Sequence, residues 1–429
     1  MRRLHGNHPA IRRLIARLAL VGCLALGLGL LGPPRASLAG LLPDSPAGTL
    51  PQLDDAGRVR AAAEPASLGL REQRVRGWSV WTQDGVPAAQ VDWTVGAAEI
   101  ATRRLPTDVG LAPPTRPVVL YLFADGDAFR RLTSELTSLP VSAIFAFEGG
   151  RSYAAGARRG IYVNAGSLAS AGQAARLVAH EMVHLAERDA AGGRPVPRWF
   201  SEGLAEHFAQ QVMARVDAPA TAERQWRRAA AVASALHRSA TLPLSALTTP
   251  AQWSDAAAAG FDRLIYAEAL LAVDWLATRG APGAMGRVID DVGHEQSFSA
   301  ALEAATGVRA SALDATMDRA LRADLLPRFP VGIHIYQESG PPGTRFQFAA
   351  VGLSPREVLT RQFEREDGYA ARNSGAPAVV GLAGAAYWTF QTRPDSLPAT
   401  WWLTVQGDQG TQARLPFSIE PAADPPPAS

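Results

Sequence analysis

The stretch from Arg176 to Ala186 constrains the fold more than any other part of the sequence. It reads Arg-Leu-Val-Ala-His-Glu-Met-Val-His-Leu-Ala and contains a His-Glu-x-x-His pattern at positions 180–184. Residues four apart lie on one face of an α-helix, about one turn from each other. A helix here therefore directs His180 and His184 toward one point and leaves Glu181 at the edge of the same face.

Local signals place this motif in the middle of a helix. Ser170 and Gln173 form a candidate capping box where the helix can begin. Gly192-Gly193 can end it. Apolar residues recur at helical spacing on the side away from the histidines: Val178, Met182 and Leu185. The sequence thus predicts a helix that buries one face in the core and carries the two histidines on the other.

A second helix is expected shortly after the first. Beyond the loop 192–197, the residues Trp199, Glu202, Glu206 and Ala209 recur at helical spacing. A loop this short lets the second helix fold back against the first. The pattern therefore predicts that Glu202 comes close to the two histidines, with Glu206 one turn further along.

Two imidazoles and one carboxylate form a ligand set typical of catalytic zinc, which also needs an open position. His180, His184 and Glu202 supply these ligands, so the sequence predicts one Zn²⁺ site. Glu181 can hold a water at the metal without being a ligand itself, which makes it the candidate general base. Glu206 can accept the free ring N–H of a ligand histidine.

Simpler interpretations of the same residues stay open. The His pair with Glu202 can be a solvated helix face, and Glu206 can be a surface carboxylate beside a histidine. A zinc ion could also be structural, although the adjacent Glu181 and the three-ligand set favour an open, catalytic position. The histidines that follow the motif lack ligand spacing and are expected on the surface or in the core: His207, His237, His294 and His334.

The motif resembles that of a known family. The chain looks like the gluzincin zinc metallopeptidases, in particular the bacterial peptidase MA-like group, on the residues His180-Glu181-x-x-His184 and Trp199-Phe-Ser-Glu202-Gly-Leu-Ala-Glu206. The likeness is specific over 170–210, looser over 75–325 and absent from the C-terminal part. It implies the same three zinc ligands and the same general base as the residues do.

The resemblance implies two further features. Gluzincins need a donor to the oxyanion of the tetrahedral intermediate, and several branches supply a Tyr or His from a later helix; Tyr266 lies at a suitable place. The alternative is a core tyrosine packed with Leu270 and Val273. The family also lines its substrate cleft with an edge strand, which would be Gly160–Asn164. An ordinary inner strand is the alternative there.

The expected activity is that of an exported, zinc-dependent metallopeptidase acting on a peptide or protein substrate. Zinc would activate water, and Glu181 would transfer its proton to the leaving amine. The alternative from another class is a cell-surface binding or adhesion protein with a latent or degenerate peptidase domain. The sequence predicts neither cleavage specificity nor oligomeric state.

The N-terminal segment has the order of an export signal. Four arginines lie in the first thirteen residues, an apolar run extends from Leu18 to Leu31, and Ser37-Leu-Ala39 offers a cleavage site. A secreted or extracytoplasmic location is therefore expected. The rival is a membrane anchor through residues 14–31, which comes close to spanning length. Lipidation of Cys23, within a lipobox-like Leu-Val-Gly-Cys, ranks third.

Composition and length bound the remaining possibilities. A net charge of +2 over 429 residues argues against nucleic-acid binding. The length is enough for two domains. The expected organisation is an export signal or anchor at 1–39, a flexible linker at 40–70, a peptidase MA-like domain at 71–328, a β-sandwich at 331–420 and a disordered tail at 421–429.

The fold class predicted is α+β: a mixed α/β lobe, a helical zinc-peptidase lobe and a C-terminal all-β, Ig-like sandwich. In the first lobe we expect strands at 74–81, 117–123, 141–147 and 160–164, with helices at 90–105 and from an Asp125 cap to 139. Later helices are expected at 221–238, 261–279, 282–292, 297–306 and 310–326. After a boundary at Pro327 to Pro330, short runs predict strands at 332–337, 344–349, 357–363, 378–382, 386–392, 400–406 and 412–419.

Overall fold

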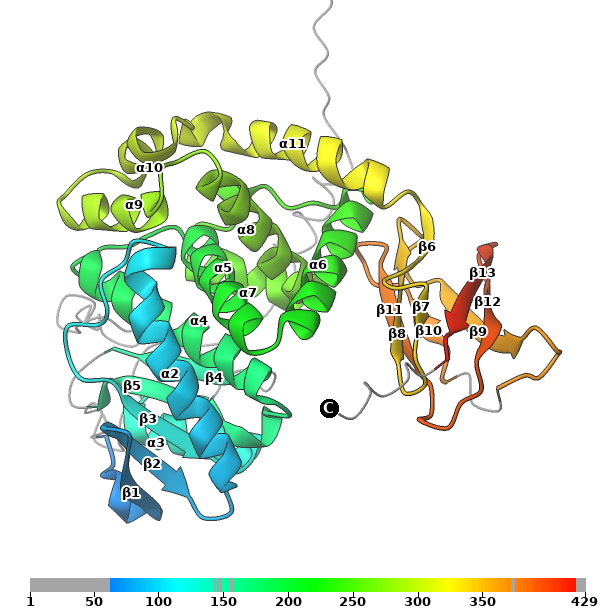
Figure 1. Cartoon of the computed structure of the whole chain (residues 1–429). Helices are drawn as coiled ribbons and strands as arrows, with labels where there is room; N and C mark the ends of the chain where they lie inside the picture. The colour runs from blue at the N-terminus through cyan, green and yellow to red at the C-terminus, as the bar shows by residue number, and fades with distance from the viewer. Residues whose placement is uncertain (1–61, 142–143, 145–148, 155–157, 372–374, 422–429) are drawn as a thin grey trace, which may run out of the picture. The chain divides into compact units, whose positions relative to one another are not determined.

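The computed structural model describes residues 62–141, 144, 149–154, 158–371 and 375–421. Helices and several sheets are mixed in these residues, as the predicted α+β class requires (Figure 1). None of the helices described is both long enough and apolar enough to cross a membrane, so the structure does not support the rival interpretation of a membrane anchor. Residues 14–31, the export signal with Cys23, and most of the strand predicted at 141–147 lie outside the described residues.

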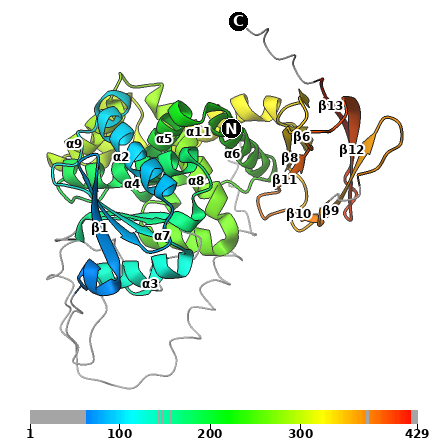
Figure 2. The same cartoon turned by 60° about the horizontal axis from the view of Figure 1, so that its bottom comes forward.

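The N-terminal part contains a five-stranded mixed sheet with two helices beside it, α2 (Ala88–Asp108) and α3 (Gly126–Thr137). Side chains alternate between the two faces of a strand. On β3, Leu120 and Leu122 belong to the core shared with α2, whereas Tyr121 and Phe123 pack with α3. The two helices therefore cover opposite faces of the sheet (Figure 2). The strand order is β1 (Leu70–Val75), β2 (Trp78–Gln83), β3 (Val119–Phe123), β5 (Gly160–Asn164) and β4 (Gly150–Tyr153).

Two expectations for this sheet were wrong. The single strand predicted at 74–81 is the hairpin of β1 and β2, because Arg76 and Gly77 both have positive φ and form a tight turn. The strand Gly160–Asn164 is not an edge strand, since β5 pairs with β3 on one side and β4 on the other. The edge strand next to β5 is β4, whose half-buried Gly-Arg-Ser-Tyr carries no period that sequence analysis could recognise.

The two motif helices form where the sequence predicts them. Helix α4 (Ala171–Ala190) begins at Ser170, whose side chain accepts the N–H of Gln173. The Gln173 side chain accepts the N–H of Ala169 rather than that of Ser170, so only half of the capping box forms. Gly192 and Gly193 have positive φ and lead the chain toward α5 (Arg198–Val216).

The later helices surround this pair (Figure 1). Gly203 on α5 makes a close approach possible, because a Cβ there would lie 2.3 Å from the carbonyl oxygen of Ala269 on α8. All five predicted helices are present, whereas α7 was not predicted, and Pro327 lies inside the last turn of α11 instead of after it. The helices are α6 (Ala218–Arg238), α7 (Pro250–Ala256), α8 (Asp262–Ala277), α9 (Ala284–Gly293), α10 (Phe298–Thr306) and α11 (Leu313–Arg328).

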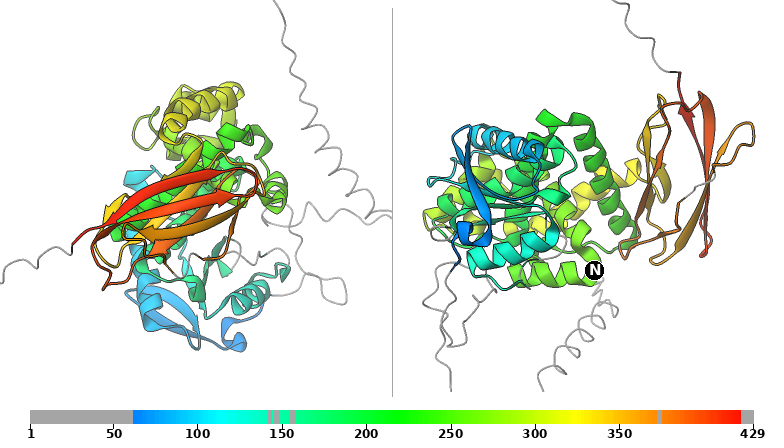
Figure 3. Two further views of the ribbon diagram at one scale, coloured as in Figure 1. Left: turned by 90° about the vertical axis from the view of Figure 1, so that its right-hand side faces the viewer. Right: turned by 90° about the horizontal axis from the view of Figure 1, so that it is seen from below.

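The C-terminal part consists of two sheets that share one apolar core (Figure 3). Every strand predicted there is present, and the two-residue strand β7 was not predicted. One sheet has the order β10 (Ala378–Val379), β9 (Val358–Arg365), β12 (Ala399–Gly407), β13 (Gln412–Ile419) and β7 (Ser339–Gly340). The other has the order β11 (Ala386–Gln391), β8 (Arg345–Val351) and β6 (Gly332–Ile335).

Helix α6 contacts the second of these sheets. Ala349 and Val351 on β8 are buried in a cluster with alanines of α6. Ser234 on α6 donates a hydrogen bond to the carbonyl oxygen of Ala383 and accepts one from the N–H of Gly352. The same cluster includes Leu264 and Ala267 on α8, so α6 packs against both another helix and the all-β part.

Candidate metal centre

Three side chains predicted as ligands converge between α4 and α5. The Nε2 atoms of His180 and His184 lie 3.2 Å apart. The carboxylate of Glu202 lies 3.3 Å from Nε2 of His180 and 3.7 Å from Nε2 of His184. Ligand atoms about 2.0–2.1 Å from a tetrahedral zinc ion are separated by roughly 3.3–3.4 Å. The three distances therefore fit the spacing that one zinc ion requires.

The burial of Glu202 supports the same conclusion. Its side chain is 1% exposed, and its Oε2 atom is buried without a hydrogen-bond partner among the described residues. A buried carboxylate oxygen without a partner is costly unless a cation or a donor satisfies it. Because Oε2 faces the ring nitrogen of His180, a cation held by both histidines would satisfy it. The donor set thus fits a bound metal ion.

A hydrogen-bonded chain orients His184. The Oγ atom of Ser201 lies 3.2 Å from Nδ1 of His184 and donates to Oε2 of Glu187 at 2.6 Å. Since the hydroxyl proton goes to Glu187, Nδ1 of the imidazole is the donor to Ser201. The proton of a neutral His184 then resides on Nδ1, and Nε2 keeps its lone pair for a metal.

Glu206 takes the corresponding place beside His180. Its Oε1 atom lies 3.5 Å from Nδ1 of His180, and its side chain is 4% exposed. Glu206 is therefore not the surface carboxylate of the alternative interpretation. Arg176 donates to Oε1 at 3.1 Å, and Arg228 donates to Oε2. These two arginines keep the buried carboxylate ionised.

The charges around the ligands shift their pKa values in opposite directions. Burial lowers the pKa of His180, but the neighbouring carboxylates of Glu202 and Glu206 outweigh burial and raise it to about 10. Burial raises the pKa of Glu202, but Arg198 and the two histidines outweigh it and lower it to about 2. The carboxylate is thus ready for a cation, whereas a metal ion has to displace a proton from His180.

The candidate base Glu181 is held by the edge strand. Its side chain is buried, and its Oε2 atom accepts a hydrogen bond of 2.7 Å from the N–H of Ser152 on β4. The carboxylate therefore connects the motif helix to the edge of the sheet. Sequence analysis missed Ser152 because β4 itself was not predicted.

Tyr266 lies on the α8 side of the site. Its ring centroid is 6.4 Å from that of His180, and the ring packs edge-on against Trp253 at 5.0 Å. Burial and the negative charge of Glu202 raise the pKa of Tyr266 above its usual value, so the phenol keeps its proton. The side chain is thus a hydrogen-bond donor near the ligands, although it also packs against the apolar core as the alternative interpretation expected.

Arg198 is a further charged group at the site that sequence analysis missed. It is the first residue of α5, and its guanidinium bonds Oε1 of Glu202, one turn further along the helix. The Arg-x-x-x-Glu spacing was the available signal, since residues four apart meet on a helix surface. Arg176, Ser201 and Arg228 were missed as well, because their partners come from other helices.

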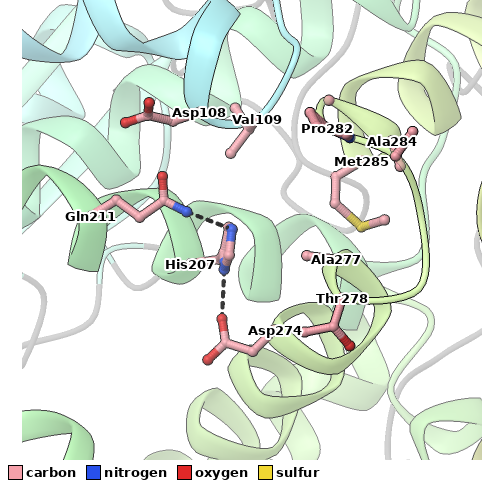
Figure 4. Close-up of a pocket in the computed structure, with 12 residues that line it drawn as sticks. Asp108, Val109, His207, Gln211, Asp274, Ala277, Thr278, Pro282, Ala284 and Met285 are labelled. Atoms are coloured by element: carbon pink, nitrogen blue, oxygen red, sulfur yellow. Dashed lines mark hydrogen bonds and ion pairs between the residues drawn. The ribbon is translucent and has the colours of Figure 1, made fainter.

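A separate cavity of about 320 Å³ involves none of the predicted ligands (Figure 4). His207 lies 2.5 Å from Oδ1 of Asp274 through Nδ1 and accepts from the Gln211 amide at 2.8 Å through Nε2. Both ring nitrogens of His207 are therefore satisfied. It connects α5 to α8, in keeping with the expectation that it has no ligand role.

Comparison with known proteins adds no further information on the site. No protein-family model matches the chain, and no curated protein matches it. The likeness to gluzincins therefore depends on the motif residues and their geometry alone.

We expect the Ser201→Ala variant to bind zinc about 10–100-fold more weakly than the wild type, because it loses the hydrogen bond that orients His184. Competition with a chromophoric chelator measures this affinity. Ser254→Ala on α7 is the control and should leave the affinity unchanged, since no hydrogen bond among the described residues joins the Ser254 side chain to a ligand. Equal affinities of Ser201→Ala and wild type would show that the Ser201 hydrogen bond does not orient the ligand.

Proposed function

We propose that the chain is a zinc-dependent peptidase with His180, His184 and Glu202 as metal ligands. The observation that carries the proposal is the approach of two Nε2 atoms and the buried carboxylate of Glu202 to within 3.2–3.7 Å of one another. One oxygen of that carboxylate, Oε2, has no hydrogen-bond partner among the described residues. A solvated helix face would have water partners for these atoms, whereas here both His180 and Glu202 are buried. A metal ion is the simplest partner for all three.

A zinc ion held there would supply Lewis acidity to a water molecule and to the scissile carbonyl. The residues of the chain account for the proton transfers. Glu181 would accept a proton from the attacking water and pass it to the leaving amine. The Ser152 N–H holds one carboxylate oxygen of Glu181, which leaves Oε1 for the proton. Tyr266, protonated at neutral pH, would donate to the oxyanion.

The proposal extends to the fold. It assigns the mixed sheet and the helices through α11 to a gluzincin-like peptidase domain of the peptidase MA-like type. It assigns the two C-terminal sheets to an Ig-like sandwich. The motif helix, a returning helix with the third ligand, and an edge strand beside the base support the first assignment. The antiparallel pairing and shared core of the C-terminal sheets support the second.

Metal analysis combined with a peptide-library digest tests the function. The full chain, purified without chelator, should carry about one zinc ion and should cleave a subset of the library. Removing the metal with 1,10-phenanthroline should abolish cleavage, and adding zinc should restore it. If no metal is bound after zinc reconstitution, the assignment of a metal site is refuted. Zinc binding without any cleavage would instead favour a binding protein with a latent peptidase domain.

A further inference from the structure

Three arginines surround the carboxylate of Glu206. Arg176 and Arg228 hydrogen-bond its two carboxylate oxygens, and Arg224 Nη2 lies 3.7 Å from Oε2. Among the described residues, no other carboxylate pairs with any of these arginines. Three positive charges therefore face one negative charge, and a single additional anion would reduce the imbalance.

Donors within this cluster have no partner among the described residues. Arg228 is 8% exposed, and its Nη1 atom is buried without a hydrogen bond. The Nε atom of Arg224 is buried and without a partner as well. Buried donors without acceptors are costly, and an oxyanion bound between these arginines would satisfy both donors.

The cluster is open to solutes on one side. The side chains of Arg176 and Arg224 are 25% and 35% exposed, whereas that of Arg228 is only 10% exposed. Burial, and then the charges of the other two arginines, lower the pKa of Arg224 to about 9. Burial and the neighbouring positive charges thus destabilise the charged form of Arg224. The cluster thus has a solvent-exposed opening at Arg176 and Arg224, a buried floor at Arg228 and more positive than negative charge. These three properties together form a binding site for an anion.

We propose that Arg176, Arg224 and Arg228 bind a carboxylate of the peptide substrate. This inference rests on the proposed peptidase function. Arg176 lies one turn before His180 on α4, and Glu206 is 3.5 Å from the ring of that ligand. A group bound by the cluster is therefore within one or two peptide residues of the metal ligands. The planar guanidinium matches the two oxygens of a carboxylate.

Two sources supply a carboxylate next to a scissile bond, namely an acidic side chain and the C-terminal carboxylate of a short peptide. Peptide pairs that differ only as Glu against Gln at each position around the bond test the first source. Pairs that end in a free acid or an amide test the second. In one of these two sets, the wild-type kcat/KM should be about tenfold higher for the peptide with the carboxylate than for its neutral counterpart, mainly because KM is lower. This ratio corresponds to about 1.4 kcal/mol.

Arg224→Gln should reduce this preference to near one. Arg227→Gln is the matched control on the same helix. Its side chain is 34% exposed, like that of Arg224, but it pairs with Glu223 instead of Glu206. The control should keep the full preference. Equal cleavage of acidic and neutral peptides by the wild type, or an equal loss in both variants, would overturn the proposal. If Arg224→Gln does not fold, Arg176→Gln takes its place.

A binding measurement separates this inference from the peptidase function. N-acetylglutamate at millimolar concentration should raise the melting temperature of the wild type, and N-acetylglutamine should not. The shift should disappear in Arg224→Gln and persist in Arg227→Gln. A wild type that cleaves no peptide but shows this pattern would refute the peptidase and keep the anion site. Stabilisation by inorganic phosphate alone would overturn the assignment to a carboxylate.

Discussion

Glu181→Gln should lower peptide hydrolysis by about 10²–10⁴-fold while metal content and folding stay unchanged. The Gln side chain is nearly isosteric, and its carbonyl oxygen can still accept the N–H of Ser152 that now bonds Glu181. It cannot take a proton from water, so only the proton-transfer step is lost. The drop should appear in kcat, because substrate binding does not depend on this proton.

Three measurements on Glu181→Gln make this prediction decisive: kcat on a peptide that the wild type cleaves, zinc per chain, and melting temperature. Glu303→Gln on α10 is the control for the chemical change, since Glu303 is exposed and far along the chain from the motif. It should retain wild-type activity. Full activity of Glu181→Gln with zinc bound would refute Glu181 as the general base.

His184→Ala is expected to lose zinc and activity together. The variant removes one of three ligand atoms, and the remaining His180 and Glu202 cannot complete a three-ligand set. The stabilisation that a bound metal gives to the folded state is lost as well, so excess zinc should no longer raise the melting temperature. This outcome differs from that of Glu181→Gln, which keeps its metal.

His294→Ala is the matched control for His184→Ala. His294 is exposed at the end of α9, where its ring bonds a backbone carbonyl oxygen. It should keep both zinc and hydrolysis. Elemental analysis and thermal unfolding with added zinc measure the two variants side by side. Retention of stoichiometric zinc by His184→Ala would show that the metal is held elsewhere, and the ligand assignment would be wrong.

Sequence periodicity predicted the elements that carry the site, because strongly apolar faces leave few alternatives. Helices α4 and α5 formed with their motif residues on facing sides, since a short loop limits where the second helix can go. The C-terminal strands were recognisable because turn residues separate them. What failed was short or polar: β4 has no apolar alternation, and the hairpin turn at Arg76-Gly77 occurs within a continuous alternating run.

Apart from Glu206, the polar and charged surroundings of the ligands were not predicted from the sequence. Ser201, Arg198 and Arg228 act on the ligands through side chains whose partners lie 4 to 22 positions away. Only the first-turn pair Arg198–Glu202 has a spacing that helix geometry explains. Contacts between helices depend on how the helices rotate about their axes, and a single sequence carries no direct signal for that rotation.

Helix α6 should be the part of this molecule in which sequence variation is tolerated least. Its alanines 229, 230 and 233 are buried between α8, α11 and β8, so any added methyl group has to displace a neighbour. Arg224 and Arg228 face Glu206, and Ser234 bonds the backbone of the all-β part. Each face of α6 thus packs against a different element. A substitution that fits against one of these elements is not compensated by a change in another. Relatives of this chain should therefore exchange residues on α6 in coordinated sets rather than one at a time.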